Sequence, residues 1–444
     1  MIRLALAAVL AVTPAMASTA STASPRSPTP APGVASLAAN PWSPTLDDPV
    51  LADLLAHAEL GSLDIRMALA RLEKARADVD LARSGGRPHL TIGAEAAIGG
   101  ADFSSSSAGA GAPVLGGYEV DLFHRLKHGQ EAAKSDQVAA LQDVATARQL
   151  VLAEVARTYV GLRADQEHRA AAELQASLAG QIEDLIRRKT MEGTAREEEL
   201  TTARTDRMRA RAELRRAEHA VEAGRMRLGL LLGQDKPVDE PAYAGDEIPA
   251  TPSMTTIPSE AVQARPDIQA AFARLQAADA RRAEAVAASR PRFMLTAGVG
   301  SGDTDLLYLL DVRALAWAVA GGLTHELLDG GAAKARKRGA EAEAQLAELA
   351  YRKTVGEAWG QARLNLAALQ DAAAAEAVAK ASWTQAVRAF GTGQTRHDDG
   401  DIDGLTLAAL EARAADADVA LTNAQAARAQ AYVDLLLALG ERAT

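Results

Sequence analysis

Acidic side chains are the residues of this 444-residue chain whose spacing could bind an ion. The string Asp399-Gly400-Asp401-Ile402-Asp403-Gly404 matches the opening of a calcium-binding loop between two helices. Such a loop needs a bidentate acid at its twelfth position, which here is Leu410, and Glu411 comes one place late. A solvated acidic loop is therefore the favoured interpretation, and we assign no metal ligand.

A second pair of acids, Glu119 and Asp121, lies two residues apart, so on a strand both would share the face opposite Tyr118. Two carboxylates on one face could form an active site, but no pattern in the chain indicates a substrate cleft beside them. The sequence also shows no nucleophile constellation, glycine-rich phosphate loop or H-E-x-x-H string. We therefore expect no catalytic residue, no cofactor and no enzymatic activity.

The composition excludes several classes of protein. Lys and Arg number 48 against 58 Asp and Glu, a formal charge of −10, and there is no basic stripe with interleaved aromatics, which argues against nucleic-acid binding. Without cysteine the chain forms neither disulfides nor a thiol nucleophile. Aromatic residues make up only 3%, and much of the 48% hydrophobic content is alanine, which favours long, closely packed helices over a large globular core.

Residues 1–17 have the features of a signal peptide. Arg3 supplies a positive charge, residues 4–12 form an apolar run, and Ala15-Met16-Ala17 is a small-residue cleavage site. Residues 18–45, rich in Ser, Thr and Pro, are typical of a flexible leader. No later segment has 18 uninterrupted apolar residues, so we expect an exported chain that would have to enter a membrane with strands.

The chain contains an internal sequence repeat of two similar halves. Arg87-Pro88 recurs 203 residues later as Arg290-Pro291, and Leu232-Gly233 recurs 207 residues later as Leu439-Gly440. Neither match depends on the abundance of alanine. The sequence therefore predicts two structural repeats, 46–240 and 258–444, joined by an irregular linker over 241–257.

Each repeat has the same expected order of elements: a helix of moderate length, a strand hairpin with apolar residues at every second position, and two long helices joined at a tip. A short helix precedes the first repeat's helix. The expected helices are 41–62, 63–83, 127–188, 267–288 and 332–390, the strand pairs are 90–98 with 114–122 and 293–299 with 315–323, and the tips are 192–194 and 391–404.

Four strands cannot close on themselves in a bilayer, and an open sheet edge there is forbidden. The chain must therefore pool its strands with copies of itself if they span a membrane. Two chains would give eight strands and three would give twelve, and periodicity alone does not choose. The alternative is a soluble periplasmic coiled-coil adaptor or scaffold, which would not explain strand hairpins at the same place in each half.

Several strings resemble those of the TolC/OprM/NodT family of outer-membrane efflux proteins. Residues 117–125, GYEVDLFHR, resemble a signature at the end of the family's second strand, although His124 stands where glycine is usual. Residues 327–331, LLDGG, resemble its counterpart in the second half. Glu199-Leu200-Thr201-Thr202-Ala203 and Leu410-Glu411-Ala412-Arg413 resemble patterns of the two descending helices. The resemblance covers essentially the whole mature sequence.

This resemblance implies a mainly α fold with a small β part. Duplicated long-helix hairpins would form a periplasmic α-barrel, and four strands from each chain of a homotrimer would form a 12-stranded transmembrane β-barrel. The implied function is a passive exit duct in the outer membrane, extending into the periplasm and docking to a periplasmic adaptor and an inner-membrane transporter. The cargo, whether drug, metal or polypeptide, stays open. The residues expected at the junction of barrel and tunnel are Tyr118, Glu119, Asp121, Asp329, Gly330 and Gly331.

In the family the tunnel narrows at its periplasmic tip, which implies a gate at Glu199, Leu407, Leu410 and Glu411. A carboxylate repeated three times at a constriction favours cations and can bind a divalent ion. The alternative is that Glu199 and Glu411 are acids near helix N-termini, where the helix dipole favours them. An acidic tip loop, expected to be longer than its partner around Gly193, contributes Asp398, Asp399, Asp401 and Asp403.

Overall fold

The computed structural model describes a single compact unit within 41–444. The expected signal peptide, the leader and most of the 241–257 linker lie outside the described residues. So do Leu327 and parts of both strand hairpins. The described residues are 48–93, 95–100, 106–111, 114–239, 251, 254, 256–303, 315–326 and 328–440.

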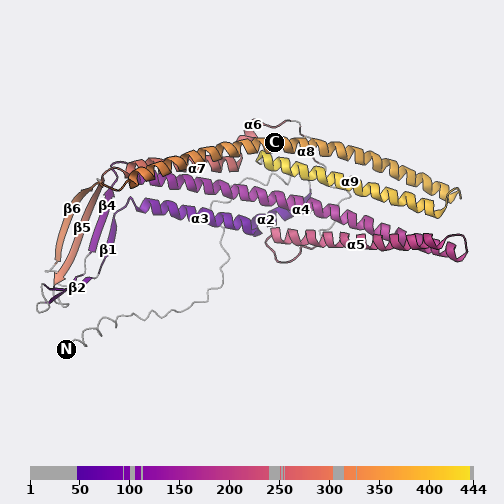
Figure 1. Cartoon of the computed structure of the whole chain (residues 1–444), viewed down its shortest axis with the longest axis horizontal. Coiled ribbons are helices and arrows are strands. Elements are labelled where there is room, and N and C mark those ends of the chain that lie inside the picture. Colours follow the sequence, from indigo (N-terminus) through magenta and orange to yellow (C-terminus); the bar gives the residue numbers. More distant parts are fainter. Residues whose placement is uncertain are drawn as a thin grey trace, which may run out of the picture. The chain divides into compact units, whose positions relative to one another are not determined.

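Helices account for most of the described chain (Figure 1). None of them, within the part of the chain that the structure describes, is both long enough and apolar enough to cross a bilayer. They are α2 Pro49–Gly61, α3 Leu63–Ser84, α4 Arg125–Met191, α5 Glu197–Leu231, α6 Ser259–Gln263, α7 Pro266–Ala288, α8 Ala332–Asp398 and α9 Gly404–Leu439.

The two long hairpins are nearly identical in size. Helices α4 and α8 have 67 residues each, and their partners α5 and α9 have 35 and 36. At about 1.5 Å per residue, each long helix extends roughly 100 Å. The strands lie at the end of α4 and α8 where these helices begin, and both tips lie at the opposite end (Figure 1).

The second tip was predicted wrongly. Helix α8 continues to Asp398, so the turn is 399–403 rather than 391–404, and it has the same length as the first turn, 192–196. The acidic loop is therefore no longer than its partner. The turn was expected to begin at Gly391, but the helix continues past it, and Gly393 is buried inside α8, where a Cβ atom would collide with the Leu410 side chain.

The main hydrophobic core lies where α2 meets the middle of the long hairpins. Leu55 of α2, Tyr159 of α4 and Leu435 of α9 are all completely or almost completely buried in it. Asp48 begins α2 by accepting hydrogen bonds from the backbone N–H groups of Val50 and Leu51. Its second carboxylate oxygen accepts a 2.6 Å hydrogen bond from the Tyr159 hydroxyl, which fixes α2 against α4.

The strands form one antiparallel meander. The six strands occupy four positions in the sheet, which we call strand paths. The first path contains β1 followed by β2, and the second contains β3 followed by β4. The third path is β5 and the fourth is β6. Because β4 pairs with β5, the two halves of the chain join within the sheet. The bounds are β1 His89–Ile92, β2 Glu95–Gly100, β3 Ser106–Gly111, β4 Val114–Val120, β5 Arg292–Asp303 and β6 Leu315–Thr324.

The register places the apolar residues of all four strand paths on one face. Ile92 pairs with Val114, Val114 with Val299, and Val299 with Trp317, so the four side chains form one row across the sheet. Ile92 is 80% exposed and Trp317 is 78% exposed. A continuous apolar face left open to this extent requires an apolar environment that one copy of the chain does not provide.

Candidate functional site

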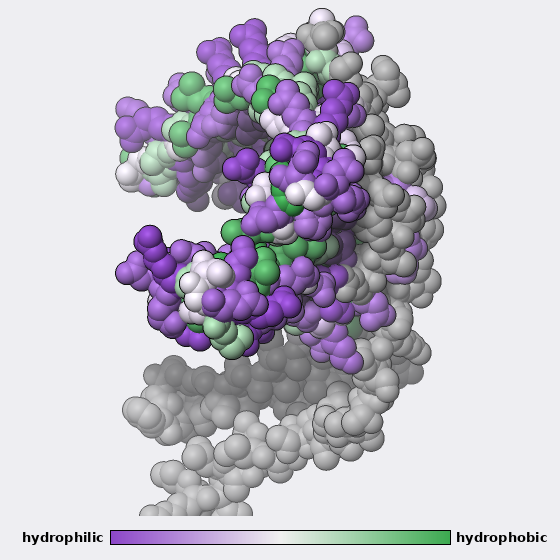
Figure 2. Space-filling model, turned by 90° about the vertical axis from the view of Figure 1, so that its right-hand side faces the viewer, coloured by the Kyte–Doolittle hydropathy of each residue, from purple (hydrophilic) through white to green (hydrophobic). Residues whose placement is uncertain are grey.

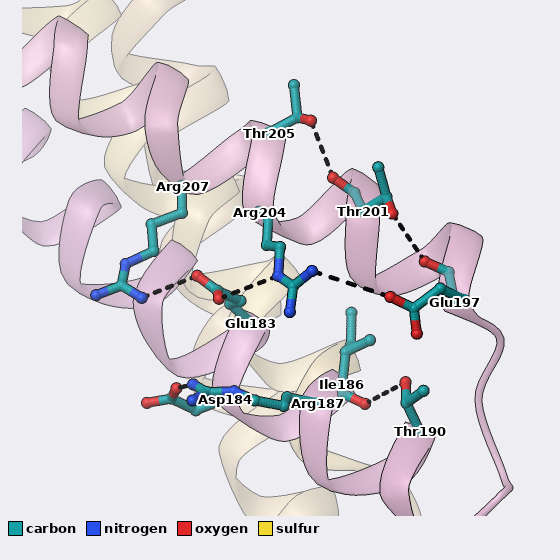
Figure 3. A network of polar contacts seen from close by, with 10 residues as sticks. All are labelled: Glu183, Asp184, Ile186, Arg187, Thr190, Glu197, Thr201, Arg204, Thr205 and Arg207. Atoms are coloured by element: carbon teal, nitrogen blue, oxygen red, sulfur yellow. Dashed lines mark hydrogen bonds and ion pairs between the residues drawn. The ribbon is translucent and has the colours of Figure 1, made fainter.

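The tip of the first hairpin is closed by a network of ion pairs between its two helices (Figure 3). Glu183 of α4 accepts a 2.8 Å hydrogen bond from Arg207 of α5, and Arg204 lies 3.9 Å from both Glu183 and Glu197. The hydrogen bond from Arg207 is the main cause that lowers the pKa of Glu183. Glu183 therefore stays ionised, and the network fixes α5 to α4.

The second tip is closed by packing and by a helix cap instead. Leu410 lies against Gly393 across the hairpin, with Ile402 of the turn beside them. The Asp403 carboxylate accepts hydrogen bonds from the Thr406 backbone N–H at 2.9 Å and from its hydroxyl at 2.7 Å, and these bonds lower the pKa of Asp403.

The ion-pair network is not repeated in the second hairpin. The helices of the two hairpins begin 207 residues apart, at Arg125 and Ala332 and at Glu197 and Gly404. The same offset from Glu183 and Arg207 leads to Phe390 and Ala414, which carry no charge. The two tips are therefore alike in length and different in what holds them together.

One ion pair connects the two tips. Lys189, in the last turn of α4, places its ammonium 3.7 Å from the Asp403 carboxylate at the start of α9. Further along the same pair of helices, the Gln175 side-chain amide donates a 2.5 Å hydrogen bond to Asp416. Helices α4 and α9 are thus linked both at the tip and behind it.

The residues predicted for the gate lie on different hairpins. Glu199 is exposed in the first turn of α5, beside Glu197 and Glu198, whereas Leu407 and Glu411 are half-buried one turn apart on α9. No hydrogen bond or ion pair joins Glu199 to either of them in the described part of the chain. Leu410 packs inside its own hairpin.

The surface at the tips is mainly hydrophilic, and smaller hydrophobic patches lie among the hydrophilic side chains (Figure 2). Asp398, Asp399 and Asp401 are exposed there. The carboxylate of Asp403 caps α9 and also forms an ion pair with Lys189. Among the residues that the structure describes, no three His, Asp or Glu side chains come close enough together to hold a metal ion.

At the junction of sheet and helices, the two predicted acids have separate partners. Glu119 of β4 receives two hydrogen bonds from the Arg125 guanidinium, at 2.8 and 3.1 Å, which raise the pKa of Arg125. Asp121 accepts a 2.9 Å hydrogen bond from the Lys127 backbone N–H and so caps α4. Tyr118 pairs with Leu295 on the apolar face, opposite the acids, as the alternation predicts.

Asp329 performs the same capping role for α8. It accepts hydrogen bonds from the backbone N–H groups of Gly331 and Ala333, at 2.9 and 2.5 Å, and these lower its pKa. Gly330 and Gly331 have φ angles of 64° and 92°, in the region that favours glycine. The residue before α4 has a similar angle, φ 63°, but it is His124.

Sequence reasoning missed Glu183, Arg204, Arg207 and Lys189. The signal available was distance from the turn: Glu183 and Arg207 lie within three helical turns of the first tip on opposite sides of it. A correct hairpin therefore brings an acid and a base together. The Lys189 contact had no such signal, because it depends on how two separate hairpins pack.

Four antiparallel strand paths with an exposed apolar face, joined to two long helical hairpins, define the class of membrane-channel proteins that continue into a helical duct. The family model described as "Outer membrane efflux protein" matches residues 54–234 and 257–441. The chain belongs to this family.

Individual relatives agree with that assignment. The outer membrane protein OprJ of Pseudomonas aeruginosa is 28% identical, over 90% of this chain and 85% of that protein. A crystal structure of a membrane protein from Pseudomonas aeruginosa is 27% identical and has a TM-score of 0.80, covering 90% of this chain and 95% of that one. The CmeC channel of Campylobacter jejuni also has a TM-score of 0.80 over 90% of this chain and 87% of its own, and at 22% identity it supports the fold alone.

The protein is therefore the outer-membrane channel of an efflux system. The alternative of a soluble periplasmic adaptor or scaffold is not supported. It would leave both the family match and the exposed apolar face of the sheet unexplained.

Proposed function

We propose that three copies of this chain form a passive exit duct that is gated at its periplasmic tip. The observation that carries the proposal is the sheet, which has an open apolar face and two outer edges, one formed by β1 and β2 and the other by β6, with no further strand beside them among the described residues. Sheet edges cannot remain unpaired in a bilayer. Each copy contributes four strand paths. Pairing β6 of one copy with β1 of the next therefore closes twelve strand paths into a barrel.

The partners follow from the kind of system. A relative from Pseudomonas putida, 28% identical over 88% of this chain and 85% of that protein, is described as "Solvent efflux pump outer membrane protein SrpC". We infer that this duct likewise works with an inner-membrane transporter and a periplasmic adaptor that binds near the tips. It performs no reaction and needs neither cofactor nor nucleic acid, and the transporter selects the cargo.

The order of the chain fits export and duplication. Residues 1–17 direct export and are removed, and 18–45 are a leader. The repeats 46–240 and 258–444, with 241–257 between them, each supply one strand hairpin and one helical hairpin. Matching lengths of α4 with α8 and of α5 with α9 support this division.

For the gate, we infer that the pair between Lys189 and Asp403 holds the two tips together in the closed duct. The first hairpin is stiffened by the network around Glu183, whereas the second lacks it, so the second is the element free to move when the pair breaks. Glu199, Leu407 and Glu411 then contribute rings at the constriction in the trimer. Leu410 remains part of this proposed set, and its packing on Gly393 would hold α9 against α8 at the constriction.

Single-channel recording in planar bilayers tests the gate. Lys189→Ala should raise the open probability several-fold, since it removes the ion pair and leaves the hairpins intact. Lys353→Ala removes an exposed lysine from the middle of α8, paired only with Glu357, and is the matched control that should leave gating unchanged. An equal response of both variants, or of neither, would contradict a latch at Lys189.

The ring of acids has its own test. Glu199→Ala and Glu411→Ala should reduce the preference for cations and the block by divalent ions, because each removes three carboxylates from the constriction of a trimer. The control is Glu348→Ala on α8, an exposed acid of the helix middle. Unchanged ion preference in both test variants would remove these residues from the constriction.

A further inference from the structure

The beginning of α8 is basic in a chain that is acidic overall. Lys334, Arg336, Lys337 and Arg338 fall within five positions, with no acid among residues 332–340. All four side chains are exposed. Lys337 pairs with Glu341 at 3.8 Å, but Lys334 and Arg338 form no ion pair with any residue that the structure describes.

Beside this segment lies a cleft that is lined by both apolar side chains and cations. It has a volume of about 660 Å³ and is bounded by the beginnings of α4 and α8 and the end of α7. Leu122 and Phe123 are its largest apolar side chains, and the Arg290 guanidinium lies 5.2 Å from the centre of the Phe123 ring. Arg282, Lys337, His124 and His128 line the remainder with Glu341.

The cleft adjoins the end of the apolar sheet face. Val120 and Phe293 pair in the last row that joins β4 and β5, and Leu122 and Phe123 follow Val120 after one intervening residue, Asp121. Leu122 is 56% exposed and Phe123 is 37% exposed. Open apolar surface therefore continues from the strands as far as the point where the cations begin.

We infer that this cleft binds the phosphate of an anionic glycerophospholipid in the periplasmic leaflet, with its acyl chains along the apolar strands. Arg290 supplies most of the positive charge. Arg282 and Lys337 add to it, although Arg282 also pairs with Asp279 at 3.4 Å and Lys337 with Glu341 at 3.8 Å. The bound headgroup fixes the depth of the sheet in the membrane. Arg290 also keeps the Phe123 ring at the boundary. The inference rests on the proposal that the sheet spans the outer membrane, because only then do lipid headgroups reach this level.

Native mass spectrometry of the detergent-extracted trimer tests the inference directly. Wild-type trimers should retain phosphatidylglycerol in preference to phosphatidylcholine added at the same concentration. The double variant Arg290→Gln/Lys337→Gln should bind phosphatidylglycerol about tenfold more weakly, because two cations near the headgroup are lost. The control variant Arg363→Gln/Arg388→Gln makes the same change of charge at exposed positions further along α8 and should bind like wild type.

Two further measurements separate lipid binding from misfolding and from binding of a free anion. Arg290→Lys/Lys337→Arg retains the charge and should retain the lipid preference, so loss of binding through misfolding is recognised. Inorganic phosphate at millimolar concentration should not displace the lipid, since the apolar strands contribute to binding. Displacement would identify a free-anion site and overturn the lipid assignment.

Equal retention of both lipids by every intact trimer would overturn the inference while leaving the duct standing. So would side chains of a neighbouring copy found filling the cleft in the trimer. Failure to obtain any trimer from the outer membrane would instead count against the proposed function itself.

Discussion

Asp403 has two roles at the tip, and both depend on its negative charge. It caps α9 through Thr406, and it pairs with Lys189 of the other hairpin. Its pKa is lowered, first by the hydrogen bond from the Thr406 hydroxyl. A carboxyl group with a lowered pKa contributes its stabilisation above its ordinary pKa of about 4 and loses it as pH falls through the lowered value.

The lowered pKa of Asp403 predicts that the duct opens in acid. As the pH falls below about 4 and through the lowered pKa of Asp403, open probability should rise, because protonated Asp403 cannot hold Lys189. Asp403→Asn should be open more often at neutral pH and should respond less to acid. Recordings across this range provide the measurement, with Asp399→Asn as the control at an exposed site. An Asp403→Asn channel with the acid response of wild type would refute the assignment.

His124 has a left-handed backbone angle that usually belongs to glycine. The strain of a non-glycine residue there is about 1–2 kcal/mol, and the extra freedom that glycine has in the unfolded chain offsets about 0.5–1 kcal/mol of it. His124→Gly should therefore stabilise the protein by roughly 0.5–1 kcal/mol, and His124→Val should destabilise it. Thermal unfolding in detergent measures both. A lower melting temperature for His124→Gly would mean that the imidazole itself stabilises the junction.

At the scale of elements, α9 approaches α8 closely at Gly393. A Cβ atom there would collide with the Cδ1 atom at the flexible end of the Leu410 side chain, so Gly393→Ala should displace this side chain and cost about 1 kcal/mol through overpacking. Leu410→Ala alone leaves a cavity, but combined with Gly393→Ala it should restore part of the loss. Melting temperatures of the three variants test this.

The decisive outcome is whether the effects of the two substitutions on the melting temperature are non-additive in the double variant. If the effects of Gly393→Ala and Leu410→Ala simply add, the two residues are not in contact across the hairpin. Gly391→Ala is a control, because it lies two residues earlier on α8 with open space around it. It should be neutral or slightly stabilising, as glycine is a poor helix former.

The elements could be predicted from sequence to the extent that their signals were local. Alternation of Leu90 and Ile92, and of Trp317 and Val319, correctly predicted which face of each strand is apolar, because side chains alternate along any strand. The second tip was predicted to begin at Gly391, whereas the packing of Gly393 against Leu410 keeps this segment helical. Ion pairs such as Lys189 with Asp403 could not be predicted, since they depend on the packing of separate hairpins.

For the whole molecule, closure of the barrel requires the free edges of the sheet to meet between copies. The chain has no cysteine of its own, so engineered pairs report without background. A cysteine replacing Leu90 on β1 together with one replacing Val319 on β6, both on the apolar face of the sheet, should cross-link neighbouring copies into covalent trimers. Cysteines replacing Leu349 and Leu364, exposed on α8, test for random contact and should give far less product. Cross-linked dimers alone, with no trimer, would contradict closure by three copies.

The most direct test of the central claim is single-particle electron microscopy of the mature protein, extracted from outer membranes in mild detergent. We expect particles with threefold symmetry, in which twelve strands form a closed wall and the helical hairpins enclose a continuous hollow tunnel. A monomer or a solid rod, absent from the outer-membrane fraction, would contradict the duct.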